Sequence, residues 1–406
     1  METAPHTPEP PPAQRSALAA LPAYSLFAFF LLGQVTVAML LQLASIPLGL
    51  ALSEVFVFAA PAFLLARAAN YKPASFLALR PPPSALLVLL GLLAGASNFV
   101  VAGGLQILGR SFVPAEIAKR YDAAHLFQGI GTGELVLVVV ALGIFAPLCE
   151  EIGFRGWIQP VLRARHGELK AVIITGILFA ALHLDPIGMA ARIELGVLFG
   201  LLAVWTRSLW PAIAAHAANN LIAAGLLVAA LTGPERAAQS PTSPLKALGL
   251  AAAGLAGVVL ILWAVRRVAA KLPEQAPPES ADPAEDHLPK AARAGLWIPA
   301  WLLAGLACAG ALLTLRWTAF QIAIADAASP PQAVTQRLPN DQARKELEKR
   351  LLAAKRQAQS GAVDLQAYRA MRGRLAELGK ADAGAALSLD EVGAAIDLGS
   401  ADAGVR

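Results

Sequence analysis

Stretches of about 20 apolar residues recur along this chain and constrain its fold more than any other feature. A helix needs about 20 such residues to cross the hydrocarbon core of a bilayer. Inside a membrane only helices and closed barrels satisfy every backbone polar group. The runs therefore predict an all-α, polytopic transmembrane helical bundle of about 8–9 spans. The expected spans are 22–45, 50–69, 84–109, 134–162, 169–184, 187–206, 209–231, 244–265 and 295–315.

The composition supports a membrane protein. Of the 406 residues, 57% are hydrophobic and 15% are charged, whereas soluble domains carry about 25% charged residues. The net charge is +5, but the basic residues do not cluster on a soluble face, as a nucleic-acid footprint requires. We expect a lipid bilayer and no nucleic acid as partners.

The loop charges predict an orientation. Basic residues are enriched in cytoplasmic loops, and four basic loops fall on one side if the N-terminus is cytoplasmic. The high content of Ala and Leu suggests a GC-rich bacterium, so we expect the chain in the cell inner (plasma) membrane. The basic residues of these loops are Arg67, Lys72 and Arg80, then Arg163, Arg165 and Lys170, then Arg207, and then Arg266, Arg267 and Lys271.

Changes in composition divide the chain into segments. The Pro-rich N-terminus is expected to be disordered, and a polar helical tail is expected to follow the last span. In the tail, Leu365, Tyr368 and Met371 begin one apolar stripe, and Ser388 with Glu391 has the spacing of a capping box. The expected segments are 1–21 (disordered), 22–231 (main bundle), 232–271 (additional span), 272–294 (Pro- and acid-rich linker), 295–315 (last span) and 316–406 (polar helical tail).

Two adjacent carboxylates, Glu150 and Glu151, lie at the end of a strongly apolar run. Charges at membrane depth are costly, and they usually mark functional sites. Arg155 follows Glu151 by four residues, which is the favourable order for an ion pair on a helix. Adjacent helical positions are about 100° apart, so we expect Glu150 to face elsewhere, available as a general base or acid. A cluster of charges at a loop edge is the alternative interpretation.

Two further spans carry polar residues. His183 ends the fifth expected span, four residues after Phe179, and His216 precedes Asn220 by four residues in the seventh. The second pair lies on one helix face, where two donors could hold a developing oxyanion. Asn219 faces about 100° away from that pair. Alone, each feature is also compatible with a packing residue or an interhelical polar clamp.

Together these motifs resemble those of the CPBP intramembrane proteases, also called the CAAX prenyl endopeptidase type II or Abi family. That family carries EExxxR, FxxxH and HxxxN on three separate spans. This chain has Glu150-Glu151-Ile-Gly-Phe-Arg155, Phe179-Ala-Ala-Leu-His183 and His216-Ala-Ala-Asn-Asn220 in that order. The resemblance covers 130–230 strongly and does not extend over 240–406.

The resemblance implies an intramembrane endopeptidase acting on a membrane-associated peptide or protein. It implies that Glu150 and His183 activate water and that His216 and Asn220 bind the oxyanion. Glu151 and Arg155 would hold the geometry of the site, with Phe179 as further support. We favour a metal-free glutamate mechanism, with no metal ligands assigned.

Three alternatives stay open at this point. Zinc is possible as a cofactor of the same site, although no HExxH pair is present. A non-catalytic bacteriocin-immunity or scaffold protein would use the fold to bind a partner, and the tail could dock such a protein. A small transporter would be expected to show repeat symmetry between its halves, which we do not find in the sequence.

Overall fold

The computed structural model forms two compact units, residues 1–39 with 47–307 and residues 40–46 with 308–406. It describes residues 12–68, 72–80, 84–114, 118, 121, 127, 130–232, 243–272, 288–328, 332–380 and 386–397. The side chains of residues 12–22, 68, 288–300, 302, 327, 332 and 360 are outside the description. The described residues contain helices and no strand, which confirms the all-α prediction.

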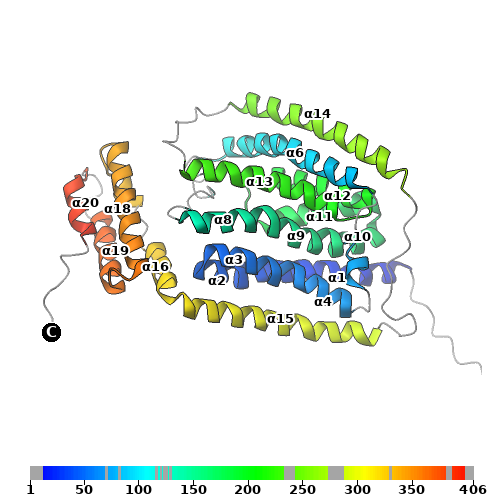
Figure 1. Ribbon diagram of the computed structural model, residues 1–406, viewed down its shortest axis with the longest axis horizontal. Coiled ribbons are helices and arrows are strands. Elements are labelled where there is room, and N and C mark those ends of the chain that lie inside the picture. Colours follow the sequence, from blue (N-terminus) through cyan, green and yellow to red (C-terminus); the bar gives the residue numbers. More distant parts are fainter. Residues whose placement is uncertain are drawn as a thin grey trace, which may run out of the picture. The chain divides into compact units, whose positions relative to one another are not determined.

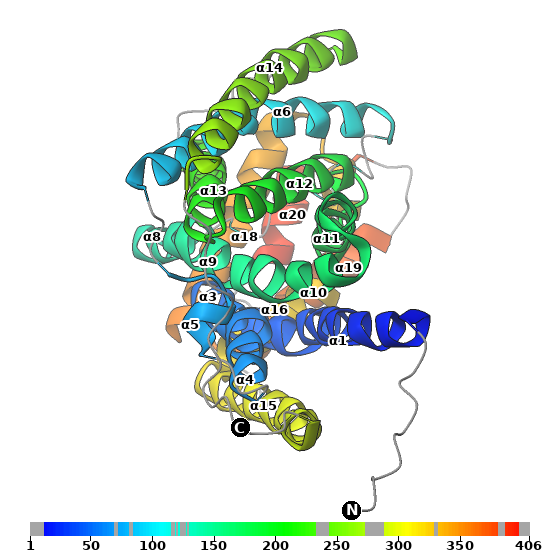
Figure 2. The same cartoon turned by 90° about the vertical axis from the view of Figure 1, so that its right-hand side faces the viewer.

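The membrane helices run side by side in the first unit (Figure 1). Figures 1 and 2 both show α11, α12 and α13 as neighbours. The bounds are α1 Pro12–Gly33, η1 Gln34–Ala38, α2 Met39–Ala44, α3 Ile46–Ser53, η2 Glu54–Ala59, α4 Ala60–Ala68, α5 Pro73–Phe76, α6 Ala85–Ser111, α8 Thr132–Val140, η4 Ala141–Phe145, α9 Ala146–Glu151, η5 Ile152–Ile158, α10 Gln159–His166, α11 Glu168–Leu182, α12 Met189–Thr206, α13 Trp210–Thr232, α14 Pro244–Ala269 and α15 Leu288–Leu315.

The number of spans is slightly lower than expected. Among the described residues, 7 helices are long and apolar enough to cross a membrane, or up to 8 if one bent pair counts as a span. The expected span 169–184 corresponds to α11, which has only 15 residues and fails this test on length. It packs against α10 and α12, while Leu169, Ile173 and Ile177 on another face are exposed.

Two of the expected segments, 1–21 and 272–294, lie partly outside the described residues, and the first of them also contains the start of a helix. Helix α1 begins at Pro12, within the segment 1–21 that we expected to be disordered, and residues 1–11 lie outside the described residues. Most of the expected linker 272–294 also lies outside them. The division into segments stays a prediction.

Wide π-helical turns interrupt the helices that carry the site. Three of these turns end two residues before a proline, namely η2 before Pro61, η4 before Pro147 and η5 before Pro160. Proline has no backbone N–H and clashes with the carbonyl four residues earlier. A local widening of the helix accommodates both defects, and such π turns often occur at functional sites. They reshape the helix on both sides of Glu150 and Glu151.

Small residues bring the helices around the site into close contact. A Cβ atom on Gly95 of α6 would lie 1.9 Å from the carbonyl oxygen of Ala215 in α13, beside His216. A Cβ atom on Gly196 of α12 would lie 2.6 Å from the Cα of Gly176 in α11. Helices in membranes commonly pack through small residues of this kind. The two contacts fix α12 and α13 against their neighbours.

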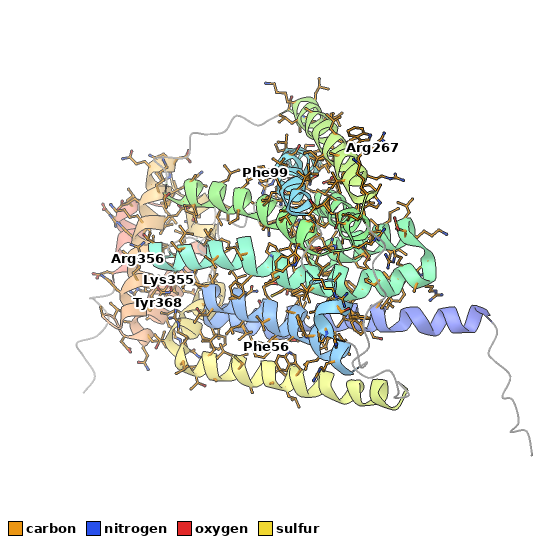
Figure 3. All side chains as sticks on the ribbon, turned by 45° about the vertical axis from the view of Figure 1, so that its right-hand side comes forward. Phe56, Phe99, Arg267, Lys355, Arg356 and Tyr368 are labelled. Atoms are coloured by element: carbon orange, nitrogen blue, oxygen red, sulfur yellow. The ribbon has the colours of Figure 1, made fainter. Side chains whose placement is uncertain are left out.

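The second unit contains a small helical domain with its own apolar core. We call α16 to α20 the tail domain; α16 is Trp317–Ala328, α17 Gln332–Gln336, α18 Asp341–Ser360, α19 Leu365–Lys380 and α20 Leu389–Ile396. The predicted stripe on α19 packs in this core through Tyr368, Met371 and Leu375. The predicted capping box of Ser388 and Glu391 is present at α20. Figure 3 shows Lys355 and Tyr368 close together within the tail domain.

Candidate active site

A buried trio of Glu151, Arg155 and His216 forms the centre of the site. The Oε1 atom of Glu151 accepts a hydrogen bond from Arg155 Nη1 at 2.8 Å and lies 2.9 Å from His216 Nδ1. The side chains of Glu151 and Arg155 are both 0% exposed. The ion pair that the spacing predicted is therefore present, and it extends to a histidine on another helix.

Aromatic rings enclose the Arg155 guanidinium. Its central carbon lies 4.7 Å from the ring centre of Phe179, 5.4 Å from that of Phe199 and 5.7 Å from that of Phe154. Its Nη2 atom donates to the carbonyl oxygen of Gly196 at 3.0 Å. Cation–π contacts of this kind gain strength when the cation is removed from water. Phe179 therefore contacts the guanidinium directly, and its role as structural support of the site stays a prediction.

The contact with Glu151 places a proton on one nitrogen of the His216 ring. A carboxylate paired with an arginine only accepts hydrogen bonds, so Nδ1 carries a proton and donates a hydrogen bond to Glu151 Oε1. The other ring nitrogen, Nε2, lies 3.8 Å from Glu150 Oε2. The Phe199 ring stacks on the imidazole at 4.6 Å with an interplanar angle of 19°. Both the position and the protonation of His216 are thus constrained.

Glu150 is the uncommitted carboxylate of the pair. The residue is 8% exposed, and its buried Oε2 atom has no hydrogen-bond partner. We expected the two carboxylates to face different surroundings, but they lie against the two nitrogens of one imidazole. A histidine ring inserted between them satisfies the helical angle and still brings both to one site. Glu150 is left with a carboxylate atom available to a ligand.

His183 lies at the edge of the site, at the end of α11. Its ring is exposed, and its Nδ1 atom is 2.9 Å from the carbonyl oxygen of Phe179. A carbonyl can only accept a hydrogen bond, so Nδ1 carries the proton and Nε2 is an acceptor. The Phe179 ring contacts His183 at 4.9 Å and His216 at 5.7 Å. Among the described hydrogen bonds, none joins His183 to Glu150 directly.

Asn220 is hydrogen-bonded to the segment that precedes Glu150 in the sequence. Its Nδ2 atom donates to the carbonyl oxygen of Leu142 in η4 at 2.9 Å, and its Oδ1 atom accepts from Asn219 at 3.3 Å. An amide nitrogen has two N–H donors, and the contact with Leu142 uses one of them. This contact fastens the HxxxN helix to the helix that carries Glu150.

A braced loop connects His183 to α12. Asp185 Oδ1 accepts hydrogen bonds from the backbone N–H groups of Ile187 and Gly188, and Oδ2 accepts from Arg192 Nη1 at 2.6 Å. Burial alone would raise the pKa of Asp185, but the hydrogen bond from Gly188 and the charge of Arg192 outweigh it and lower this pKa. Leu184 adopts a left-handed backbone conformation, with φ of 51°. The loop therefore sets where the His183 ring lies.

Sequence reasoning missed several partners. Arg192 and Glu194 had no assigned role. The structure pairs Arg192 with Asp185, and Glu194 Oε2 accepts from Asn98 Nδ2 at 2.9 Å. Glu54 in η2 interacts electrostatically with Glu150, and its buried Oε2 atom has no hydrogen-bond partner. Polar residues inside the second and third expected spans were the available signal for Glu54 and Asn98.

The donor atoms at the site do not fit a three-ligand zinc centre. Structural and catalytic zinc sites use at least three protein ligands. Among the described residues, no group of three or more His, Cys, Asp or Glu side chains could hold a metal ion. Glu151 is engaged by Arg155 and His216. We derive no step through zinc.

One comparison with known proteins identifies the segment that carries this site. The family model described as type II CAAX prenyl endopeptidase Rce1-like matches residues 132–222. The match supports the assignment of this segment to the CAAX-type protease family. The Rce1-like segment begins with α8 and ends within α13, so it contains all three motifs. No curated protein and no solved structure matches the chain.

Proposed function

We propose that this chain is an intramembrane endopeptidase that hydrolyses a peptide bond with a glutamate-activated water. The family supplies the protease class and the membrane setting. The observation that carries the proposal is the asymmetry of the diacid. The Oε2 atoms of both residues lack a hydrogen-bond partner, but Glu151 is neutralised by Arg155 at 2.8 Å. Among the described ion pairs, Glu150 is matched only with His216 Nε2, at 3.8 Å. A general base requires such an uncommitted carboxylate within reach of the water that it deprotonates.

In this mechanism Glu150 removes a proton from water as the water attacks the scissile carbonyl. The Nε2 atom of His183 can accept a hydrogen bond from the same water, because Nδ1 is engaged by Phe179. Both imidazoles contact the Phe179 ring, His183 at 4.9 Å and His216 at 5.7 Å, so the reacting carbonyl would lie near that ring.

The oxyanion that forms requires donors. His216 would be an imidazolium throughout the reaction and would present Nε2–H, and Asn220 would present its second amide N–H. Glu151 stabilises the imidazolium and fixes its orientation, much as a buried carboxylate does in a catalytic triad. Transfer of the proton from Glu150 to the leaving amine would complete the hydrolysis.

The substrate class follows from the location and the family. A site built on membrane helices acts on a membrane-associated peptide or protein, and the CAAX-type family points to cleavage next to a lipidated cysteine. The bacterial inner membrane and a cytoplasmic N-terminus stay predictions from composition and loop charge.

The proposal is tested by cleavage of fluorogenic peptides, prenylated and unprenylated, by the purified chain in lipid vesicles. We expect Glu150→Gln to lower the cleavage rate at least about 10²-fold, the lower range for loss of a general base. Glu168→Gln removes an exposed carboxylate at the start of α11 and is the matched control. Full activity of Glu150→Gln would refute the assigned role.

A chelator distinguishes the two enzymatic versions. We expect wild-type cleavage to continue after exhaustive chelation. Loss of activity that added zinc restores would favour the zinc-dependent enzyme. A wild-type chain that cleaves no peptide of the series, yet binds one irrespective of Glu150, would favour the scaffold protein.

A further inference from the structure

The tail domain begins with a helix that turns away from the last membrane helix. The segment Leu303–Leu315 of α15 and the segment Trp317–Asp326 of α16 are bent by 89° at Arg316. Figure 1 shows this turn clearly. If α15 crosses the bilayer as the sequence predicts, α16 lies nearly parallel to the membrane plane. In that arrangement, its position directly after the span would put it at the membrane surface.

One face of α16 packs on the tail domain. Ile322 is 0% exposed in the core of that domain. Four residues later, Asp326 accepts a hydrogen bond from the Tyr368 hydroxyl at 2.7 Å and forms an ion pair with Lys355 Nζ at 2.9 Å. Arg372 Nη2 also donates to the backbone carbonyl of Asp326. These contacts fasten the end of α16 to α18 and α19.

Another face of α16 is apolar and exposed. Leu315, just before the bend, is 82% exposed, Trp317 is 55% exposed and Ile324 is 45% exposed. The Trp317 and Phe320 rings pack together at 5.6 Å. Positions 317, 320 and 324 follow the spacing of one helix face. Exposed apolar residues grouped in this way mark an interaction site.

We propose that α16 is an interfacial helix that holds the tail domain on the membrane surface, with the bilayer itself as the partner of its exposed face. Three observations favour lipid over a protein partner. The helix continues directly from an apolar membrane helix, it turns by about a right angle at the expected membrane boundary, and a tryptophan follows the turn. Tryptophan is enriched at membrane–water interfaces, and interfacial helices bury their apolar face roughly 5–10 Å into the headgroup and acyl boundary.

The depth of α16 can be measured with a fluorophore. The full chain, with Cys149→Ala and Cys308→Ala, carries a single environment-sensitive label at Ile324→Cys and is reconstituted in phosphatidylcholine–phosphatidylglycerol vesicles. Glu348→Cys, an exposed site on α18, is the matched control. Nitroxides at the lipid headgroup or at mid-chain, and iodide in the water, then quench the fluorescence.

We expect the label at position 324 to be quenched most by the headgroup nitroxide and to be shielded from iodide. The label at position 348 should show the reverse. Three results would overturn the proposal. Iodide quenching equal at both sites would place α16 in water. Strongest quenching by the mid-chain nitroxide would make α16 part of a re-entrant or broken span. Shielding from iodide without quenching by any lipid would indicate a protein partner or a second copy. None of these readouts depends on proteolytic activity.

Discussion

Two clusters of charged side chains stabilise different units of this chain, and they differ in exposure. Around Glu151, the carboxylate and the Arg155 guanidinium are both 0% exposed. Around Asp326 in the tail domain, the side chain of the carboxylate is 24% exposed and that of Lys355 is 35% exposed. Both carboxylates accept hydrogen bonds from more than one neighbour. Water reaches the second cluster and is excluded from the first.

Exposure changes what each cluster contributes. Removing one partner of a fully buried ion pair leaves an uncompensated charge in a poor solvent for ions, which is strongly destabilising. Partly exposed pairs exchange much of their interaction with water, and most contribute little. We infer that the Glu151 cluster holds the proposed catalytic groups in position with high precision, whereas the Asp326 cluster fastens two helices and tolerates change.

The largest expected effect is at Arg155. Arg155→Met keeps the apolar stem in its cage of rings but removes the cation that neutralises Glu151. We expect a destabilisation of about 3–5 kcal/mol, together with loss of cleavage activity. The measurement is the thermal unfolding midpoint of the chain in detergent. Arg163→Met, at an exposed site of α10, is the control and should leave the midpoint unchanged.

Arg155→Lys sharpens this test. It keeps the positive charge but cannot contact Glu151 and the carbonyl of Gly196 with two separate nitrogens of one planar group. We expect stability between that of wild type and that of Arg155→Met. If Arg155→Met were as stable as wild type, the buried pair would not be the constraint that we infer.

A smaller effect is expected at Tyr368 in the tail domain. Tyr368→Phe keeps the ring in the apolar core and removes only the hydroxyl that donates to Asp326. Lys355 still pairs with the carboxylate, so we expect a loss of roughly 1–2 kcal/mol. Hydrogen exchange of the α19 amides in the full chain reports it. Tyr121→Phe, which changes an exposed tyrosine of the first unit, is the control and should leave the protection of the α19 amides unchanged. If Tyr368→Phe protected these amides as well as wild type does, the role given to the Tyr368 hydroxyl would be wrong.

The sequence predicted the parts of the molecule that depend on periodicity. Apolar runs predict membrane helices, the stripe through Tyr368 predicts a buried face, and the spacing of Glu151 and Arg155 predicts an ion pair, because each is a local geometric property of a helix. The three motifs also resembled the family that the comparison with known proteins now supports. These inferences needed no knowledge of how the helices pack.

Contacts between helices could not be predicted in this way. The approach of His216 to both carboxylates depends on the close packing of Gly95 against α13 and on π turns upstream of Pro147 and Pro160. Helix spacing alone placed the two carboxylates about 100° apart and missed the ring that lies between them. The partners of Arg192 and Glu194 lie on other segments, so their pairing could be learned only from the three-dimensional structure.

The smallest expected effect is at Asp185, and it depends on pH. The pair of Arg192 and Asp185 has side chains that are 27% and 12% exposed, between the buried and the exposed clusters. The pKa of Asp185 is lower in the folded chain than its usual value, so its ionised form stabilises the fold. That contribution is complete above the unfolded pKa of about 3.9 and is lost as the pH falls through the lower, folded pKa.

Asp185→Asn isolates the charge, because an amide oxygen can still accept the hydrogen bonds from Ile187 and Gly188. We expect it to be less stable than wild type by up to about 1 kcal/mol. The difference in thermal unfolding midpoint between wild type and Asp185→Asn should be constant from pH 5 to 8, because Asp185 is ionised in both the folded and the unfolded chain there. At more acidic pH the difference should fall towards zero. Asp185→Ala also removes the two backbone contacts, so it should lower stability further and slow cleavage by displacing His183. A difference between Asp185→Asn and wild type that grew on acidification would contradict the direction of the pKa shift and the stabilising role of this ion pair.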